Sequence, residues 1–187
     1  MKVLLTGGTG FLGARLARAL LDRGVLTGVN GEEESIDEMV LFDSADLSGL
    51  SEEKEGDLLI RRVVGDISDR ETVMGLLDRD DMSVFHLAAV SSTLAAEMDF
   101  DLAMRVNLDG TRHLLEGLRA REGLQRLVFL SSIAVFGGPG MPRCVGDLAK
   151  QTPQSTYGIT KAIVELLIND YTRKGFLDGR SARMPSR

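Results

Sequence analysis

The feature that most constrains this chain is a cluster of glycines between a short apolar run and an amphipathic helical pattern. Segment 6–13 reads Thr-Gly-Gly-Thr-Gly-Phe-Leu-Gly, and a helical pattern extends from it over 11–23. Gly7 permits a sharp turn, Gly10 lets a pyrophosphate approach the backbone, and Gly13 lets the helix pack closely on the strand. The N–H groups at such a helix start favour phosphate. The segment therefore predicts a nucleotide-binding turn.

Strand and helix patterns alternate along the rest of the chain. Apolar strand runs fall at 3–5, 39–42, 60–64, 84–90, 127–131 and 180–184, and helical patterns at 11–23, 69–79, 96–121 and 155–174. Alternation of this kind predicts an α/β fold with a doubly wound parallel sheet, the Rossmann arrangement. The acidic stretch 28–38 is expected to be a solvated loop. The polar stretch 44–57 is expected to be a connection, with or without a short helix.

The length of 187 residues suits one domain, 1–187, with a core of its own. The sequence stops where a sixth strand begins, whereas domains of this type normally continue. We therefore expect an incomplete polypeptide that lacks its C-terminal, substrate-binding part.

The composition excludes several classes of protein. There are 28 acidic and 22 basic side chains, a net charge of −6 and a pI of about 5.0, which argues against binding to nucleic acid or an anionic membrane by bulk charge. A single cysteine and two histidines, far apart, indicate neither a disulfide framework nor a metal site. Apolar runs fall far short of the roughly 20 residues that span a bilayer. We expect a soluble, cytoplasmic protein.

An acidic residue at the end of the second strand indicates which dinucleotide is bound. Asp43 can accept hydrogen bonds from the adenosine ribose and would repel a 2′-phosphate, so NAD is favoured over NADP. Asp66 and Ile67, after the third strand, are expected to flank the adenine. The fourth strand ends in small and apolar residues that let the cofactor lie against the backbone, namely Leu87, Ala88 and Ala89.

A tyrosine and a lysine spaced four residues apart suggest acid–base chemistry. Tyr157 and Lys161 fall on one face of a predicted helix, and a nearby ammonium would lower the phenol pKa. That makes Tyr157 a usable general base near neutral pH. Ser131 and Ser132 end the preceding strand. Each feature is weak alone, but together, beside a glycine turn, they are specific.

Five segments, in this order along the chain, resemble the extended short-chain dehydrogenase/reductase family, also called the NAD-dependent epimerase/dehydratase family. They are the glycine turn, His-Leu-Ala-Ala at 86–89, Asn107, Ser-Ser-x-x-Val-Phe-Gly at 131–137 and Pro-Gln-Ser-x-Tyr-Gly-x-x-Lys at 153–161. The resemblance covers essentially the whole chain. One departure is Phe136, where many members carry tyrosine.

The resemblance implies a role for each matching position. Ser132 would orient the substrate oxygen, Tyr157 would be the acid–base, and Lys161 would bind the nicotinamide ribose. Asn107 would support the active site. The cofactor set implied by the motifs is Gly7, Gly10, Phe11, Leu12, Gly13, Asp43, Asp66, Ile67, Leu87, Ala88, Ala89, Ser131, Tyr157 and Lys161.

Three functions stay open on the sequence. Segments 155–171 and 181–186 are most similar to members that oxidise the C2 hydroxyl of a four-carbon sugar acid with NAD. A nucleotide-sugar epimerase or dehydratase would use the same residues, and a non-catalytic NAD sensor is the third possibility. Family members pair through two helices, so we expect a homodimer through the helices at about 96–121 and 155–174, both rich in apolar residues.

The remaining reactive side chains are expected to do no chemistry. His86 and His113 are interpreted as packing or surface residues, and Cys144 as an inert thiol. Arg143 and Arg187 could meet a substrate carboxylate, although surface arginines are the ordinary interpretation.

Overall fold

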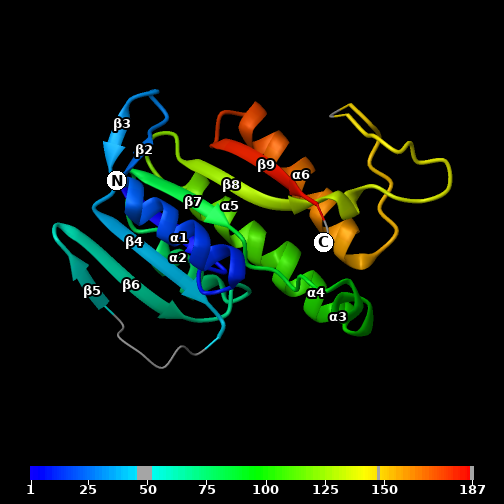
Figure 1. The fold of residues 1–187 in the computed structure, drawn as a ribbon, viewed down its shortest axis with the longest axis horizontal. Helices are drawn as coiled ribbons and strands as arrows, with labels where there is room; N and C mark the ends of the chain where they lie inside the picture. The colour runs from blue at the N-terminus through cyan, green and yellow to red at the C-terminus, as the bar shows by residue number, and fades with distance from the viewer. Residues whose placement is uncertain (46–51, 147, 186–187) are drawn as a thin grey trace.

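The fold is a mostly parallel sheet with helices on both faces. A computed structural model describes residues 1–45, 52–146 and 148–185. Within these residues the main sheet has the strand order β5-β6-β4-β1-β7-β8-β9, and all neighbouring strands are parallel except β5 and β6 (Figure 1). The order reverses next to β1, as in doubly wound sheets. The predicted fold class is confirmed.

The elements alternate along the chain as the sequence predicts. The strands of the main sheet are β1 (Lys2–Thr6), β4 (Glu38–Asp43), β5 (Glu52–Glu55), β6 (Leu58–Val64), β7 (Met82–His86), β8 (Arg126–Ser132) and β9 (Asp178–Met184). The helical segments are α1 (Phe11–Arg23), α2 (Arg70–Leu76), α3 (Thr93–Met98), α4 (Phe100–Ala103), the π-helical η1 (Met104–Asp109), α5 (Gly110–Arg119), the 3₁₀ turn η2 (Ile133–Val135) and α6 (Thr156–Arg173).

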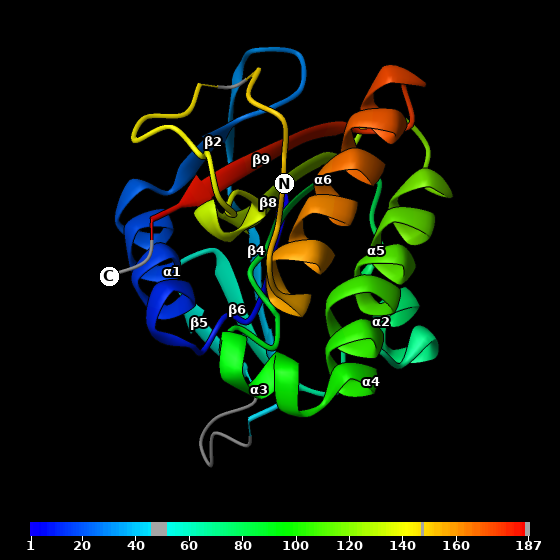
Figure 2. The ribbon, with the colours of Figure 1, turned by 90° about the vertical axis from the view of Figure 1, so that its right-hand side faces the viewer.

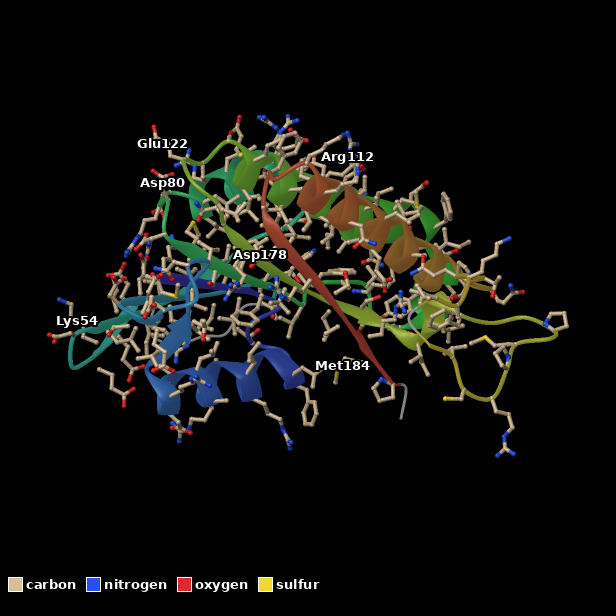
Figure 3. All side chains as sticks on the ribbon, turned by 90° about the horizontal axis from the view of Figure 1, so that it is seen from above. Lys54, Asp80, Arg112, Glu122, Asp178 and Met184 are labelled. Atoms are coloured by element: carbon tan, nitrogen blue, oxygen red, sulfur yellow. The ribbon has the colours of Figure 1, made fainter. Side chains whose placement is uncertain are left out.

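Two helical layers enclose the sheet (Figures 2 and 3). Helices α2, α5 and α6 lie on one face, and α1 lies on the other. Side chains of β1 show why its sequence is continuously apolar: Leu4 packs in the cluster under α2, α5 and α6, whereas Val3 and Leu5 pack in the cluster that includes α1. All three are fully buried. A central parallel strand is covered on both faces, so both sets of side chains must be apolar.

The acidic stretch 28–38 was predicted to be a loop, but part of it forms a strand. Residues Glu33–Ser35 form β3, which pairs antiparallel with β2 (Val25–Thr27) in a separate hairpin. Gly31 at the turn has φ +87°, and the Asn30 side chain accepts a hydrogen bond from the Glu32 N–H at 2.9 Å. An Asn-Gly pair stabilises such turns, and this local signal outweighs the low strand propensity of the glutamates.

The polar stretch 44–57 ends in a strand and not in a helix or coil. Residues 46–51 lie outside the described part, but Glu52–Glu55 form β5 and pair antiparallel with β6 through a turn at Gly56, whose φ is +63°. All four side chains are exposed. Charged residues are suited to an edge strand because they oppose pairing with a further chain.

The long helix predicted at about 96–121 is broken into four segments. Asp99 leaves the helical region, with φ −133° and ψ 84°, and its carboxylate caps the start of α4 by accepting from Leu102 N at 2.9 Å. Segment η1 then makes one wide turn before α5. A wide turn of this kind commonly marks a functional position, and this one carries Asn107.

Candidate active site

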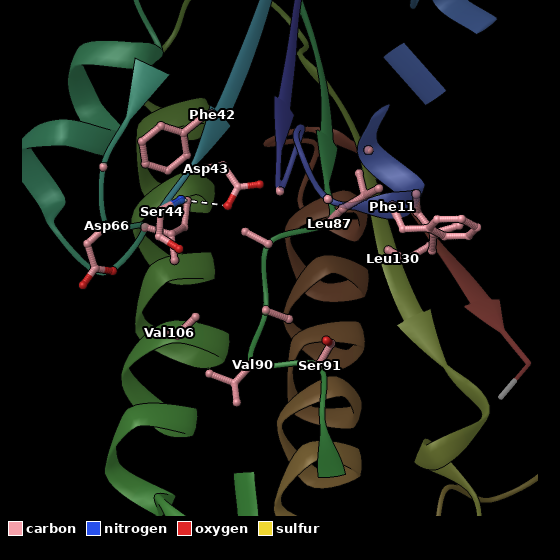
Figure 4. A pocket seen from close by; sticks show the side chains of 18 of the residues that line it. Phe11, Phe42, Asp43, Ser44, Asp66, Leu87, Val90, Ser91, Val106 and Leu130 are labelled. Carbon is pink, nitrogen blue, oxygen red and sulfur yellow. Dashed lines mark hydrogen bonds between the residues drawn. The ribbon is translucent and has the colours of Figure 1, made fainter. Parts of the chain in front are cut away.

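A cleft of about 860 Å³ opens at the carboxyl ends of β1, β4, β6 and β7 (Figure 4). Most of the residues predicted to bind the cofactor line it: Gly7, Gly10, Phe11, Leu12, Gly13, Asp43, Asp66, Ile67, Leu87, Ala88 and Ala89. Of the described residues predicted for the cofactor, Ser131, Tyr157 and Lys161 lie outside this lining. The sequence analysis did not single out other lining residues, including Phe42, Ser44, Val90 and Leu130.

The glycine turn is packed so closely against its neighbours that Gly7 and Gly13 leave no room for a side chain. A Cβ on Gly7, whose φ is +69°, would lie 2.8 Å from the backbone nitrogen of Ala88, and a Cβ on Gly13 would lie 2.1 Å from the Gly7 carbonyl oxygen. Helix α1 begins at Gly10 with no side-chain cap and no acidic residue in its first turn among the described residues. Its first N–H groups therefore face the cleft, where phosphate oxygens can accept from them.

Strand β7 is shorter than predicted, and the residues that follow it form a wall of the cleft beside the glycine turn. The apolar run predicts a strand over 84–90, but β7 ends at His86, the partner of the last β1 residue, Thr6. Because β1 ends at Thr6, residues 87–90 have no β1 residue beside them with which to pair. They cross the mouth of the cleft as irregular chain (Figure 4).

A buried chain of hydrogen bonds joins this wall to the helices. The Ala88 N–H donates to Thr6 Oγ1, which lies 2.6 Å from His86 Nδ1, and His86 Nε2 lies 2.8 Å from Thr111 Oγ1. Thr111 Oγ1 donates to the Asn107 carbonyl at 2.7 Å, so it must accept from His86. Nε2 therefore carries a proton, and in the neutral imidazole Nδ1 accepts from the Thr6 hydroxyl. Burial, followed by the Lys161 charge, lowers the pKa of His86 to about 3.

Asn107 links the cleft wall to α6. Its side-chain oxygen accepts from Val90 N at 2.7 Å, and its amide nitrogen donates to Thr160 Oγ1 at 3.2 Å. Thr160 in turn donates to the Tyr157 carbonyl at 2.9 Å. Asn107 is buried. The amide thus fixes the distance between the cleft and the helix that carries Tyr157.

Ser132, Tyr157 and Lys161 lie together beside the cleft. The side chain of Ser132 lies near the Tyr157 phenol and acts to lower its pKa. Lys161 Nζ donates to the carbonyl of Leu130, a cleft-lining residue, at 2.8 Å, and lies 4.5 Å from the centre of the Phe129 ring. Only 3% of Lys161 is exposed. The arrangement offers a hydroxyl, a phenol and an amine at the end of β8 and the start of α6.

The expected depression of the Tyr157 pKa is wrong for the cofactor-free protein. Burial raises the pKa of this phenol, and the interaction with Ser132 only partly opposes that effect. The Lys161 ammonium points at the sheet carbonyl and lies 5.6 Å from the centre of the Tyr157 ring. Burial also lowers the pKa of Lys161 to about 7, so its own charge is reduced near neutral pH.

The Ser131 hydroxyl is engaged in a buried network on the far side of β8. It donates to Glu165 of α6, whose carboxylate also accepts from Gln151 and from Arg183 of β9, with Arg183 Nη2 at 2.6 Å. The Arg183 guanidinium lies 4.9 Å from the centre of the Phe136 ring. The network fastens β8, β9 and α6 together beneath Ser132.

The other reactive side chains lie apart from the cleft. His113 is half-buried on α5, and Cys144 and Arg143 are exposed in the loop after η2, whereas Arg187 lies outside the described residues. No group of His, Cys, Asp and Glu side chains in the described part is arranged to hold a metal ion. None of the described helices is both long and apolar enough to cross a bilayer.

A glycine turn, a cleft at the strand ends and a Ser-Tyr-Lys group together define a dinucleotide-dependent enzyme fold, and the comparison with known families agrees. The NAD dependent epimerase/dehydratase family matches residues 3–186, so the chain belongs to that family. The description of this family names NAD, which confirms the predicted cofactor.

Two curated relatives are similar to this chain over 186 residues. The chain is 48% identical over 186 residues to the D-erythronate dehydrogenase of Cupriavidus necator, and 39% identical over 186 residues to that of Haemophilus influenzae. Each alignment covers 100% of this chain and 55% of the relative, so the chain spans about half the length of these curated proteins.

Solved structures give the same picture of the fold. A nucleoside-diphosphate-sugar epimerase from Agrobacterium tumefaciens is similar with a TM-score of 0.85 and 35% identity, over 100% of this chain and 53% of that one. The UDP-glucose 4-epimerase of Brucella ovis, in complex with NAD, is similar with a TM-score of 0.75 and 27% identity, over 97% and 51% of the two chains.

Proposed function

We propose that this chain is part of an NAD-dependent dehydrogenase that oxidises the C2 hydroxyl of a small sugar acid, with D-erythronate as the substrate. The observation that carries the proposal is the group formed by Ser132, Tyr157 and the buried Lys161 beside a cleft that fits a dinucleotide. The names of the two curated relatives support the substrate class. The described chain is proposed to be the cofactor-binding part of this enzyme, over residues 1–187.

Each residue of the group has one task in the proposed reaction. Ser132 donates a hydrogen bond to the substrate alcohol and orients its oxygen. Tyr157, as phenolate, takes the hydroxyl proton. Lys161 holds the nicotinamide ribose, and Asn107 keeps the helix that carries Tyr157 in register with the cleft. NAD, when bound, accepts the hydride from the carbinol carbon.

Asp43 is proposed to select NAD over NADP. Its carboxylate lines the cleft at the end of β4, where the ribose hydroxyls can donate to it and a 2′-phosphate would be repelled. Asp66 and Ile67, on the same side of the cleft, are proposed to flank the adenine.

The test is a turnover assay on the full-length protein with NAD and a panel of four-carbon and six-carbon sugar acids. We expect NADH to accumulate with D-erythronate, as followed by its ultraviolet absorbance, and not with Tyr157→Phe. Absence of NADH with every acid would contradict the proposed dehydrogenase activity.

The second candidate is a nucleotide-sugar epimerase or dehydratase, which would return the hydride to its substrate. The likeness to the Agrobacterium tumefaciens protein at a TM-score of 0.85 favours it. Conversion of a nucleotide-sugar without net NADH would establish this alternative. A non-catalytic NAD sensor is disfavoured because Ser132, Tyr157 and Lys161 are all present.

The proposal includes a cytoplasmic homodimer, but the surface that supports it is smaller than the sequence analysis expected. Leu114 and Leu118 of α5 and Ile168 of α6 are in the core. Exposed apolar side chains remain on α6, where 63% of Leu166 is exposed, and on α3 and α4, where 79% of Met98 is exposed. Light scattering at micromolar concentration tests the dimer, and a monomer would contradict it.

A further inference from the structure

We propose that Thr9 is a positioning residue that enforces the preference for NAD over NADP by holding the carboxylate of Asp43 in one orientation. The inference rests on the proposed role of Asp43 and extends it to a residue outside the cleft lining. Thr9 lies inside the glycine turn, between Gly8 and Gly10.

The contacts of Asp43 use both of its carboxylate oxygens. Oδ2 accepts from Thr9 Oγ1 at 2.6 Å and from Thr9 N at 3.2 Å. Oδ1 accepts from Ser44 N at 2.8 Å, the bond drawn in Figure 4. Both oxygens are therefore anchored, and the carboxylate turns only if the bonds to Thr9 or Ser44 break.

The backbone sets the approach of Thr9 to Asp43. The Gly8 N–H donates to the Phe42 carbonyl at 3.2 Å, which fastens the glycine turn to the end of β4. A Cβ on Gly8 would lie 3.0 Å from the Leu41 Cα, so only glycine lets the turn come this close. Thr9 thus faces Asp43 because of the turn itself, and its β-branch restricts the hydroxyl to few rotamers.

An anchored carboxylate discriminates more strongly than a mobile one. A ribose diol needs an acceptor at a fixed position. Oδ2 already accepts two bonds from Thr9, so the diol would use Oδ1, which accepts from Ser44 N at 2.8 Å and more weakly from Ala45 N at 3.4 Å. A 2′-phosphate brings negative charge to the same place, and it binds only if the carboxylate turns away. Hydrogen bonds to an ionised acceptor are about twice as strong as neutral ones. Breaking them adds to the cost of binding NADP and leaves NAD unaffected.

The competing interpretation is that Thr9 only stabilises the turn. In that case, loss of the hydroxyl would weaken NAD and NADP equally, because both share the pyrophosphate that the turn holds. The ratio of the two dissociation constants separates the interpretations, since a purely structural role leaves it unchanged.

The experiment measures Kd for NAD and for NADP by titration calorimetry on the full chain. Thr9→Val removes the hydroxyl and keeps the branched shape, while Thr9→Ser keeps the hydroxyl as the matched control. We expect Thr9→Val to lower the ratio of Kd for NADP to Kd for NAD by about tenfold, equivalent to about 1.4 kcal/mol. Thr9→Ser should stay within about twofold of the wild-type ratio.

The Asp43→Ala background shows whether Thr9 acts through Asp43. There, Thr9→Val should change the ratio no further. If Thr9→Val fails to fold, Thr9→Ala serves in its place. An unchanged ratio in a wild type that prefers NAD would overturn this inference alone. A wild type that binds both dinucleotides equally would overturn the role of Asp43 and this inference with it.

Discussion

The two ends of the parallel sheet are built from different interactions. At the carboxyl ends of the strands, the cleft is lined mainly by glycines and apolar side chains, together with the hydroxyls of Ser44 and Ser91 and the carboxylates of Asp43 and Asp66. At the amino ends, charges are paired. Lys2, only 1% exposed, donates to the Leu76 carbonyl at 2.9 Å and contacts Asp78 at 2.5 Å, and Arg79 bridges Asp37 and Asp81.

The difference shows how one sheet separates stability from binding. Fixed negative charges at the cleft would repel the phosphates of the dinucleotide, and fixed positive charges would bind them in place of the backbone N–H groups. At the opposite end of the sheet, paired charges hold the starts of the strands together and face no ligand. The charged side chains in the described cleft lining are Asp43, held by Thr9, and Asp66, held by the Ser68 N–H. We therefore expect substitutions at the cleft end to change catalysis and binding, and those at the ion-paired end to change stability alone.

The largest expected effect is on the rate, from Tyr157→Phe. Removal of a general base costs roughly 10²–10⁴-fold in kcat. The affinity for NAD and the free energy of unfolding should change little, because the ring remains in place. In the wild type, kcat should rise with pH as the phenol ionises, over an alkaline range because burial raises the Tyr157 pKa. Retention of more than about a tenth of kcat would refute the assigned role.

A smaller effect, on both stability and binding, is expected from Gly13→Ala. The new Cβ would meet the Gly7 carbonyl oxygen at 2.1 Å, so the turn and α1 must separate. We expect a loss of about 3 kcal/mol in the free energy of unfolding, measured with urea, together with weaker NAD binding. The matched control is Gly75→Ala in α2, where a Cβ has no described neighbour within 4 Å. It should stabilise the fold by about 0.5–1 kcal/mol.

At the opposite end of the sheet, Lys2→Met should reduce stability by about 2 kcal/mol and leave the Kd for NAD unchanged. The substitution leaves the Leu76 carbonyl without its donor and Asp78 without its partner. Lys54→Met, on the exposed edge strand β5, is the control and should be nearly neutral. A change in NAD affinity with Lys2→Met would show that the two ends are coupled and break the comparison.

The smallest effect concerns acid pH. The hydrogen bonds from Arg79 are the largest influence that lowers the pKa values of Asp37 and Asp81 below 3.8. These carboxylates add stability above their unfolded pKa, and that contribution is lost as pH falls through the lower folded pKa. The temperature at which half of the protein is unfolded should therefore decrease as the pH is lowered below about 4. Arg79→Met should flatten this dependence, while Arg112→Met on α5 should not.

Much of the fold could be predicted because its signals are local. The glycine turn, the apolar runs and the capping residue Asp69 mark elements within a few residues of where they occur. Misplaced elements depend on partners elsewhere. The strand Glu52–Glu55 is too charged to suggest a strand, and it exists because β6 offers an edge. The last residues of the predicted strand 84–90 lose their pairing because β1 ends at Thr6.

The candidate site was predictable in its parts but not in its connections. Spacing put Tyr157 and Lys161 on one helix face, yet spacing cannot show that the ammonium turns to a carbonyl of β8. Thr9 was missed because the sequence pattern of a dinucleotide-binding turn is defined by its glycines. Its signal was a hydroxyl in the turn and a carboxylate ending the neighbouring strand, which only the sheet order brings together.

The hydrogen-bond chain through His86 has a consequence for folding and hydrogen exchange. It joins Thr6 to His86 across 80 residues of sequence and continues to α5 through Thr111. None of these bonds can form until β1 lies beside β7 and α5 has docked, so the wall of the cleft is a late product of folding. The Ala88 amide, which donates to Thr6, should therefore exchange with solvent only when the sheet itself opens. The binding wall and the sheet then form one cooperative unit, which opens and closes as a whole.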